Sequence, residues 1–299
     1  MIFSPFGRGV ISAVLAYSLW GILPLYWKLL AFVTPLHILA FRILFSLVLV
    51  SLLLLGMKNT AWLALFRNKT KALLLILEAL TISVNWGLYI WAVNRGHTIE
   101  ASLGYYINPL VSIILGLIFF KERLGVLQWT AFGVGSLGVL LMAFLSGAPP
   151  WISLGLALSF GFYGLLKKKI SLSVLESLGA ETLVAGPLGL ALLFFPYGNF
   201  SDLSGLGVSS WLLLSSIGLA TTLPLYLFGL GAQRLPLSAM GFIQFISPTF
   251  QFFLGILVFG ESFPARNYAA FALIWTAVIL YSISLKKRPS PKIPGTTGS

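Results

Sequence analysis

The stretch Asn94 to Glu122 reads N-R-G-H-T-I-E-A-S-L-G-Y-Y-I-N-P-L-V-S-I-I-L-G-L-I-F-F-K-E, and a related copy begins 139 residues later. The offset sets Ile107-Asn108-Pro109 over Ile246-Ser247-Pro248 and Phe120-Lys121-Glu122 over Phe259-Gly260-Glu261. Both copies have a polar turn, an apolar helix interrupted by proline, and an acidic exit. A repeat of about half the chain length indicates two related halves.

The composition indicates an integral membrane protein. The chain has 58% hydrophobic and 9% charged residues, whereas soluble domains have about 25% charged residues. Crossing about 30 Å of hydrocarbon takes about 20 apolar residues in a helix. We therefore expect an all-α integral membrane protein with ten transmembrane helices, at residues 9–27, 35–56, 72–94, 98–120, 126–144, 151–166, 174–195, 208–232, 237–259 and 267–285.

The repeat also predicts the topology. Each copy holds five spans, an odd number, so we expect two inverted five-helix repeats over residues 1–147 and 148–285, followed by a basic, disordered tail at 286–299. Fifteen of the 19 Lys and Arg residues fall on the side of the N-terminus, three (Lys28, Arg95 and Arg266) fall on the other side, and Arg42 lies within a span. Because cytoplasmic loops are enriched in Lys and Arg, both termini should be cytoplasmic.

Several classes of function are excluded by what the sequence lacks. The chain has no cysteine, which excludes disulfides and thiolate metal sites. It has no G-x-x-x-x-G-K-[ST], H-E-x-x-H or G-x-S-x-G motif, and its single aspartate, Asp202, falls in a loop. His37 and His97 cannot form a spaced metal pair, so we expect no metal and no cofactor. The basic residues form short runs between spans, so we expect no nucleic-acid partner.

These observations favour a secondary transporter, because inverted repeats with proline-broken helices are an arrangement that transporters use. It would move a small metabolite or drug-like molecule across the plasma (inner) membrane by alternating access, without ATP hydrolysis. Two alternatives stay open: an intramembrane enzyme acting on a lipid-linked substrate, and a passive scramblase or structural membrane protein. We also expect a homodimer through spans 126–144 and 267–285.

Five segments of the chain resemble the RarD family, which belongs to the EamA branch of the drug/metabolite transporter superfamily. They are N-W-x-L-Y-I-W-A-V-N at 85–94, E-A-S-L-G-Y-Y-I-N-P-L at 100–110, F-G-F-Y-G-L-x-K-K at 160–168, Glu181-Thr182, and G-F-x-Q-F-I-S-P-T at 241–249. The resemblance runs over essentially the whole chain. It implies two inverted five-helix repeats, with spans 126–144 and 267–285 at the periphery and a central cavity surrounded by spans 9–27, 72–94, 98–120, 151–166, 208–232 and 237–259.

Polar and aromatic residues inside the spans are candidates for a substrate site between the repeats. Aromatic faces supply contact area, and amides fix the orientation of a ligand. We expect the site to be lined by Trp20, Asn85, Trp86, Tyr89, Tyr106, Asn108, Tyr163 and Gln244. Prolines remove backbone donors within helices, which makes Pro109, Pro224 and Pro248 candidate hinges.

Three charged residues inside the spans, Glu181, Glu78 and Arg42, are candidates for proton or ion coupling. Intramembrane carboxylates often mark proton relays, although each could instead pair with a helix-end lysine such as Lys71 or Lys167. Arg42, which the repeat sets against Glu181, could hold an anionic substrate group or extend to the lipid headgroups. At the helix exits, Glu122 and Glu261 are expected to form salt bridges within loops.

Overall fold

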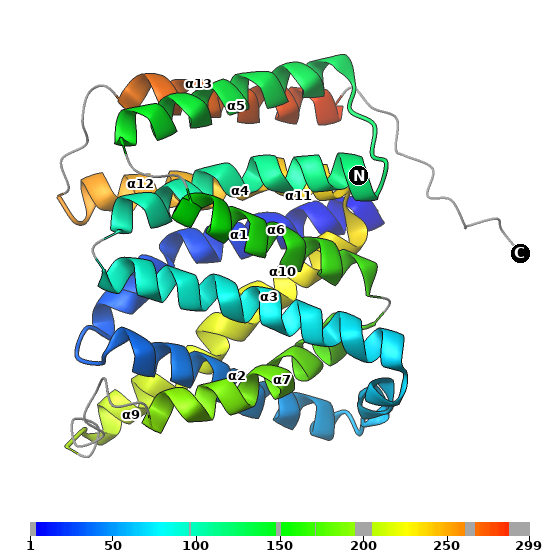
Figure 1. The fold of residues 1–299 in the computed structure, drawn as a ribbon, viewed down its shortest axis with the longest axis vertical. Helices are drawn as coiled ribbons and strands as arrows, with labels where there is room; N and C mark the ends of the chain where they lie inside the picture. The colour runs from blue at the N-terminus through cyan, green and yellow to red at the C-terminus, as the bar shows by residue number, and fades with distance from the viewer. Residues whose placement is uncertain are drawn as a thin grey trace, which may run out of the picture.

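The computed structural model describes residues 4–95, 97–147, 151–170, 172–194, 205–260 and 267–286, and this part of the chain contains helices and no strand (Figure 1). The helices run side by side across the molecule, and the start of the first helix and the end of the last described helix lie on the same side of it. We call this side the terminal face and the other the opposite face. The predicted tail beyond Lys286 lies outside the described residues, as does Glu261.

The helices follow the predicted spans closely. The first half contains α1 (Pro5–Leu29), α2 (Pro35–Gly56), the 3-10 helix η1 (Ala61–Arg67), α3 (Lys69–Asn94), α4 (Thr98–Phe119) and α5 (Val126–Ser146). The second contains α6 (Trp151–Lys169), α7 (Val174–Phe194), α9 (Val208–Ser215), α10 (Ile217–Arg234), α11 (Leu237–Gln244), α12 (Ile246–Leu257) and α13 (Tyr268–Lys286).

Length and hydropathy confirm an all-α, multi-pass membrane protein. In the described part of the chain, nine helical segments are long and apolar enough to cross a membrane, with α9 and α10 counted as one segment and α11 and α12 as another. Helix α6 has a similar length, but its last three residues are lysines, which lower its mean hydropathy. With α6 included, the segments correspond in order to the ten predicted spans.

Local sequence explains where helices begin. Ser4 caps α1 by accepting a hydrogen bond from the Gly7 N–H at 3.0 Å, and proline occupies the first turn, where no donor is needed. The start of α11 is capped by the Glu122 carboxylate, which accepts from the backbone N–H groups of Leu237 at 2.6 Å and Ser238 at 2.9 Å. The expectation of a loop salt bridge at Glu122 is therefore replaced by a cap, which suits the positive end of a helix dipole.

Two predicted spans are interrupted rather than continuous. The span at 208–232 is divided at Ser216, between α9 and α10, and the span at 237–259 is divided at Phe245, between α11 and α12. Pro248 lacks the N–H that would bond to the Gln244 carbonyl, which accounts for a break at this point. Pro109 and Pro224 lie within the continuous helices α4 and α10. A hinge role for the three prolines stays a prediction.

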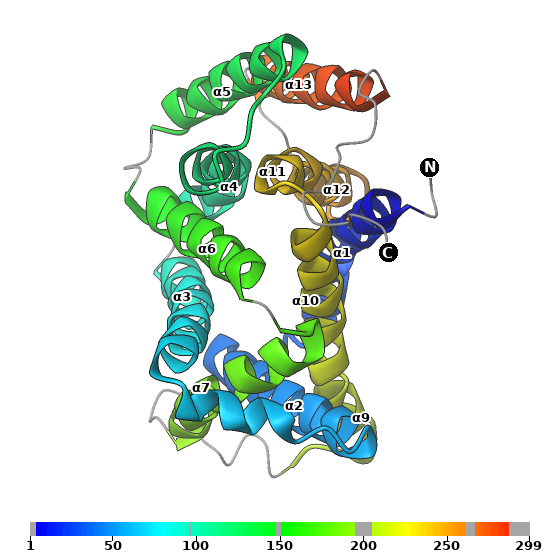
Figure 2. The ribbon, with the colours of Figure 1, turned by 90° about the vertical axis from the view of Figure 1, so that its right-hand side faces the viewer.

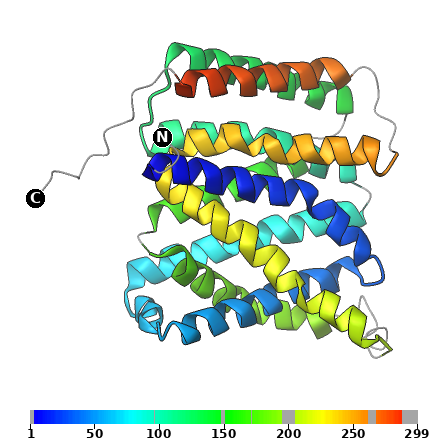
Figure 3. The same ribbon diagram turned by 180° about the vertical axis from the view of Figure 1, so that it is seen from behind.

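Seen along the helices, the bundle consists of a ring and a peripheral pair (Figure 2). Helices α5 and α13 pack on each other outside the ring. A Cβ on Gly138 of α5 would lie 2.9 Å from the Ala270 carbonyl oxygen of α13, so this close approach requires glycine. On the side of the bundle that faces away from the viewer in Figure 1, α1 and α10 cross and are in contact (Figure 3). The predicted homodimer through α5 and α13 stays a prediction.

Candidate functional site

A cavity of about 170 Å³ lies within the ring, closer to the opposite face than to the terminal face. It is bounded by the later turns of α1 and α3 and by the early turns of α2 and α4, together with α6, α10, α11 and α12. These include the helices expected from the family resemblance, with α2 in addition. The wall residues are Tyr17, Trp20, Leu23, Pro24, Trp27, Arg42, Ile82, Asn85, Trp86, Tyr89, Ser102, Gly104, Tyr105, Asn108, Leu156, Phe160, Leu225, Gln244, Ser247, Pro248 and Gln251.

Most of the predicted substrate-site residues lie on this wall: Trp20, Asn85, Trp86, Tyr89, Asn108 and Gln244. Tyr106 does not, because its ring packs against Phe271 of α13 at a centroid distance of 5.5 Å. Successive helix residues point about 100° apart, and Tyr105 takes the position that faces the cavity. Tyr163 is fully buried below the cavity, where its hydroxyl donates to Glu181.

The sequence analysis missed Tyr17, Trp27, Tyr105 and Gln251 on the cavity wall. A signal was present in α1, since Tyr17, Trp20 and Trp27 recur at intervals of three and seven residues and so share one helix face. Gln251 lies two helical turns after Gln244 on the same wall, beyond the break at Phe245.

Arg42 lies on the cavity wall between two aromatic rings. Its guanidinium carbon is 4.5 Å from the centre of the Trp86 ring and 5.2 Å from that of Trp27, within cation–π distance. Its Nε donates to the Thr221 hydroxyl at 3.4 Å. The repeat sets Arg42 opposite Glu181, but no ion pair joins Arg42 to a carboxylate in the described part of the chain.

The two asparagines on the wall differ in their bonding. Asn85 donates from Nδ2 to the Leu156 carbonyl and to the Ser159 hydroxyl, both at 2.9 Å, so it fastens α3 to α6. Asn108 is 3% exposed, and its Oδ1 accepts no hydrogen bond from any described residue. Buried polar groups usually have partners, so Asn108 is a residue of the cavity wall whose amide oxygen the described residues leave unsatisfied.

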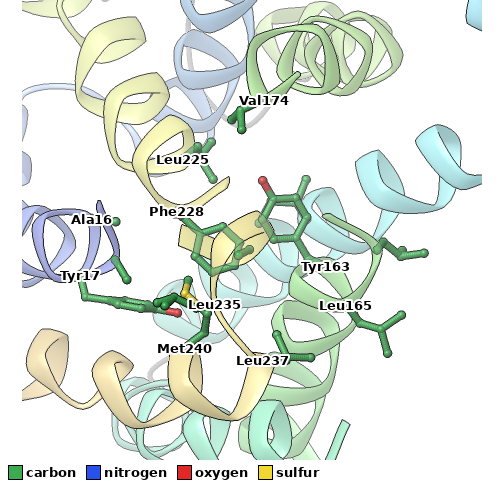
Figure 4. Close-up of a cluster of buried hydrophobic side chains, with 14 of the residues drawn as sticks. Ala16, Tyr17, Tyr163, Leu165, Val174, Leu225, Phe228, Leu235, Leu237 and Met240 are labelled. Atoms are coloured by element: carbon green, nitrogen blue, oxygen red, sulfur yellow. The ribbon is translucent and has the colours of Figure 1, made fainter. Parts of the chain in front are cut away.

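Below the cavity, a layer of aromatic rings closes the bundle toward the terminal face. In Figure 4 the Phe228 ring lies between Tyr17 and Tyr163. The Phe228 and Tyr163 rings are stacked with centroids 5.7 Å apart, and the Tyr17 and Phe228 rings meet edge to face at 6.1 Å. Such ring pairs add stability beyond the apolar area that they bury.

A buried ion cluster lies beyond this layer and joins three helices. Lys167 of α6 is 1% exposed, with its Nζ 2.6 Å from Oε1 of Glu78 on α3 and 2.9 Å from Oε2 of Glu181 on α7. It also donates to the Ser177 hydroxyl at 3.1 Å, so all three ammonium N–H groups have acceptors. Ser177 bonds to Glu78 in turn, and Tyr163 donates to Glu181 at 3.2 Å. The structure thus selects Lys167, not Lys71, as the partner of both carboxylates.

A second, smaller cavity of about 10 Å³ lies between the ion cluster and the central cavity. Ile82, Trp86 and Leu225 line both cavities and form the partition between them. The small cavity is also lined by Glu181 and by Thr222, whose Oγ1 is buried and bonds to no described residue. Its volume is comparable to that needed to hold one water molecule.

The fold and the central cavity together define a class of protein: a multi-pass membrane bundle with a ligand-sized site between helices, the architecture of a small-molecule transporter. Comparison with known proteins agrees with this class. A model of the EamA-like transporter family matches residues 7–144 and again residues 150–283. The chain therefore belongs to the EamA-like transporter family and is a membrane transporter rather than an enzyme.

Individual relatives confirm the resemblance to RarD. The chain is 47% identical over 275 residues to "Protein RarD" of Streptomyces exfoliatus, covering 91% of this chain and 87% of the relative. It is 42% identical over 284 residues to "Uncharacterized transporter YojE" of Bacillus subtilis (strain 168), covering 94% and 95% of the two chains. One crystal structure aligns with a TM-score of 0.72 at 18% identity, covering 93% of this chain and 99% of the solved chain, which shows a shared fold.

Proposed function

We propose that this protein is a secondary transporter that moves a small metabolite or drug-like molecule by alternating access, without ATP hydrolysis. The observation that carries the proposal is the central cavity, whose wall is built from both segments that match the family. Helices α1 to α4 come from the first segment, and α6, α10, α11 and α12 from the second. A site at the interface of two halves can open to either face when the halves exchange conformations.

The two halves are proposed to be inverted repeats, residues 1–147 and 148–285. In chain order, the counterparts are α1 and α6, α2 and α7, α3 and α10, α4 and the pair α11 and α12, and α5 and α13. Exchanging each helix for its counterpart turns the contact of α1 with α10 into that of α6 with α3. It also turns the contact of α4 with α6 into that of α12 with α1. All four contacts exist. The pairs α2 with α7, α4 with α11, and α5 with α13 map onto themselves and are also in contact. This pattern, and the double match to one family, support a two-fold relationship.

We propose that the terminal face is cytoplasmic and that the protein resides in the plasma (inner) membrane. The support is the asymmetry of positive charge counted along the sequence, in which fifteen Lys and Arg residues fall on the side of the N-terminus and three on the other side. In this orientation the cavity lies in the outer half of the bundle and the ion cluster in the inner half.

Energy coupling is proposed to use the cluster of Glu78, Lys167 and Glu181. Two carboxylates surround one ammonium, so the fully ionised cluster has a net charge of −1 in a site without solvent contact. Uptake of one proton would neutralise it, and buried charges are costly unless compensated. A transport cycle in which the cluster binds and releases a proton would therefore link substrate movement to the proton gradient.

Transport by purified protein in liposomes tests the proposal. Candidate substrates come from comparing metabolites inside and outside cells that lack or overproduce the protein. We expect uptake without ATP, stimulated by a proton gradient, and we expect Glu181→Gln to abolish accumulation while exchange continues. Accumulation by the Gln variant against a gradient would leave Glu181 a structural role only. Failure to move any candidate, with turnover of a lipid-linked substrate instead, would refute transport.

A further inference from the structure

Of the described residues that line the central cavity, Arg42 alone has a formal charge. The other polar groups on the wall are amides, hydroxyls and phenols, and no carboxylate lies within salt-bridge distance of the guanidinium in the described part of the chain. A cation in such an environment lacks the compensation that buried charges normally have. The central cavity is therefore electropositive when it is empty of ligand.

The contacts of Arg42 hold its side chain in place and leave its binding groups available. Two ring faces, of Trp27 and Trp86, position the guanidinium, and Nε is used by Thr221. The two terminal nitrogens, which have four N–H groups, donate to no described residue. This planar arrangement of donors matches the two oxygens of a carboxylate.

Asn108 provides an independent indication of a ligand. Its side chain belongs to the same cavity wall, and its Oδ1 is buried and has no partner among the described residues. The same amide has two N–H donors on Nδ2, which suit an oxygen acceptor of an anionic ligand. Arg42 and Asn108 thus both have polar atoms that are not bonded within the described part of the protein.

We propose that the cavity takes a small organic anion that has a flat apolar portion, its anionic group paired with Arg42. The aromatic side chains of the wall, such as Trp20 and Tyr105, provide the surface for the apolar portion. A free inorganic anion would leave this surface unused. The proposal deepens the proposed transport function, since it names the substrate class of the same site.

Binding in detergent tests the substrate class without requiring transport. The probes are phenylacetate, phenylacetamide and 2-phenylethylamine, which have similar size and shape but are anionic, neutral and cationic. Tryptophan fluorescence of the purified chain in an uncharged detergent reports binding, because Trp20, Trp27 and Trp86 line the cavity. We expect phenylacetate to bind at least about tenfold more tightly than the amide, and the amine to bind most weakly.

Variants separate Arg42 from general charge effects. Arg42→Gln should reduce the preference for phenylacetate to less than about twofold, and Arg42→Lys should retain part of it, because lysine keeps the charge and loses the planar fork. Arg234→Gln, which removes an exposed charge at the end of α10, should leave the preference unchanged. Melting curves establish that each variant is folded.

The comparison of the three probes on the unmodified protein decides the proposal even if Arg42→Gln does not fold. Equal binding of phenylacetate and phenylacetamide, or binding of none of the three, would overturn it. So would quenching by dihexanoylphosphatidylglycerol without quenching by phenylacetate, which would assign Arg42 to a lipid headgroup. Transport of a neutral molecule together with equal probe binding would refute the anion and leave the transporter, so the two proposals fail separately.

Discussion

Replacing Lys167 by methionine removes the only cation from the buried cluster and leaves Glu78 and Glu181 without a counter-charge. Methionine has a similar length and fills the same space, so the change is mainly electrostatic. All three side chains are at most 2% exposed, and the ammonium lies 2.6 Å and 2.9 Å from the two carboxylates. Removing one partner of a buried ion pair typically costs about 3–5 kcal/mol. We expect a loss in this range, or a fall in melting temperature on the order of 10 °C.

Charge balance predicts that the carboxylate variants behave differently. Glu181→Gln leaves Lys167 paired with Glu78, a neutral set, and the glutamine oxygen can still accept from Lys167. Its cost should be about 1 kcal/mol, that of one weakened hydrogen bond. The triple variant with Lys167→Met, Glu78→Gln and Glu181→Gln should recover most of the loss caused by Lys167→Met, because it contains no unpaired charge.

The assay is thermal unfolding in detergent followed by tryptophan fluorescence, since the chain has nine tryptophans and no cysteine for a thiol-reactive dye. Lowering the pH should narrow the gap between Lys167→Met and the unmodified protein, because each proton that binds cancels one unpaired charge. If Lys167→Met melts within about 2 °C of Glu181→Gln at neutral pH, the charges of the cluster do not determine its stability.

Other single side chains give contrasts that the same melting assay can measure. Asn108→Leu should leave stability unchanged or raise it, because the buried Asn108 oxygen has no partner among the described residues. Asn85→Leu should cost about 1–2 kcal/mol, because it loses two hydrogen bonds. A larger loss for Asn108→Leu than for Asn85→Leu would contradict these bonding patterns. Gly241→Ala should destabilise the contact of α11 with α4, since the new Cβ would lie 2.6 Å from the Pro109 carbonyl oxygen. Gly87→Ala, whose new Cβ would have no atom within 4 Å, should increase stability by up to about 1 kcal/mol. Equal melting temperatures of the two variants would argue against the close packing of α11 on α4. Glu122→Gln should cost about 1 kcal/mol and speed hydrogen exchange of the first amides of α11, and unchanged exchange would show that the cap is dispensable.

The spans and their order could be predicted because their signals are local. Apolar length, proline in the first turn of α1 and α2, and the lysine run that ends α6 are all visible in sequence. The breaks at Ser216 and Phe245 could not be placed, since Pro224 is eight residues after Ser216 and Pro248 is three residues after Phe245, and proline alone does not distinguish a kink from a break. Pro109, in the equivalent position of the repeat, lies in an uninterrupted helix.

The candidate site was predictable only where residue type and helix face coincide. Asn85 and Trp86 were identified because an amide and an indole in the middle of a span are costly in lipid. Tyr105 and Tyr106 are adjacent and chemically identical, so only the packing of α4 against α13 decides which faces the cavity. Lys167 was one of three lysines in a run; its inward direction follows from its position one turn after Tyr163, whereas Lys169 is exposed.

The positions of the two polar sites limit how access to the cavity can change under the proposed mechanism. The central cavity lies toward the opposite face, and the path to the terminal face is closed by the aromatic layer around Phe228 and by the ion cluster. That cluster joins α6 to α3 and α7 through Lys167, so these helices cannot separate on the terminal face without opening the cluster to water or moving as one unit. Separation would hydrate Glu78 and Glu181, which is the condition under which buried carboxylates exchange protons readily. The same residues would then control both the opening of the terminal face and proton exchange, and a variant with a neutral cluster, such as Glu181→Gln, would open without a proton and run as an exchanger.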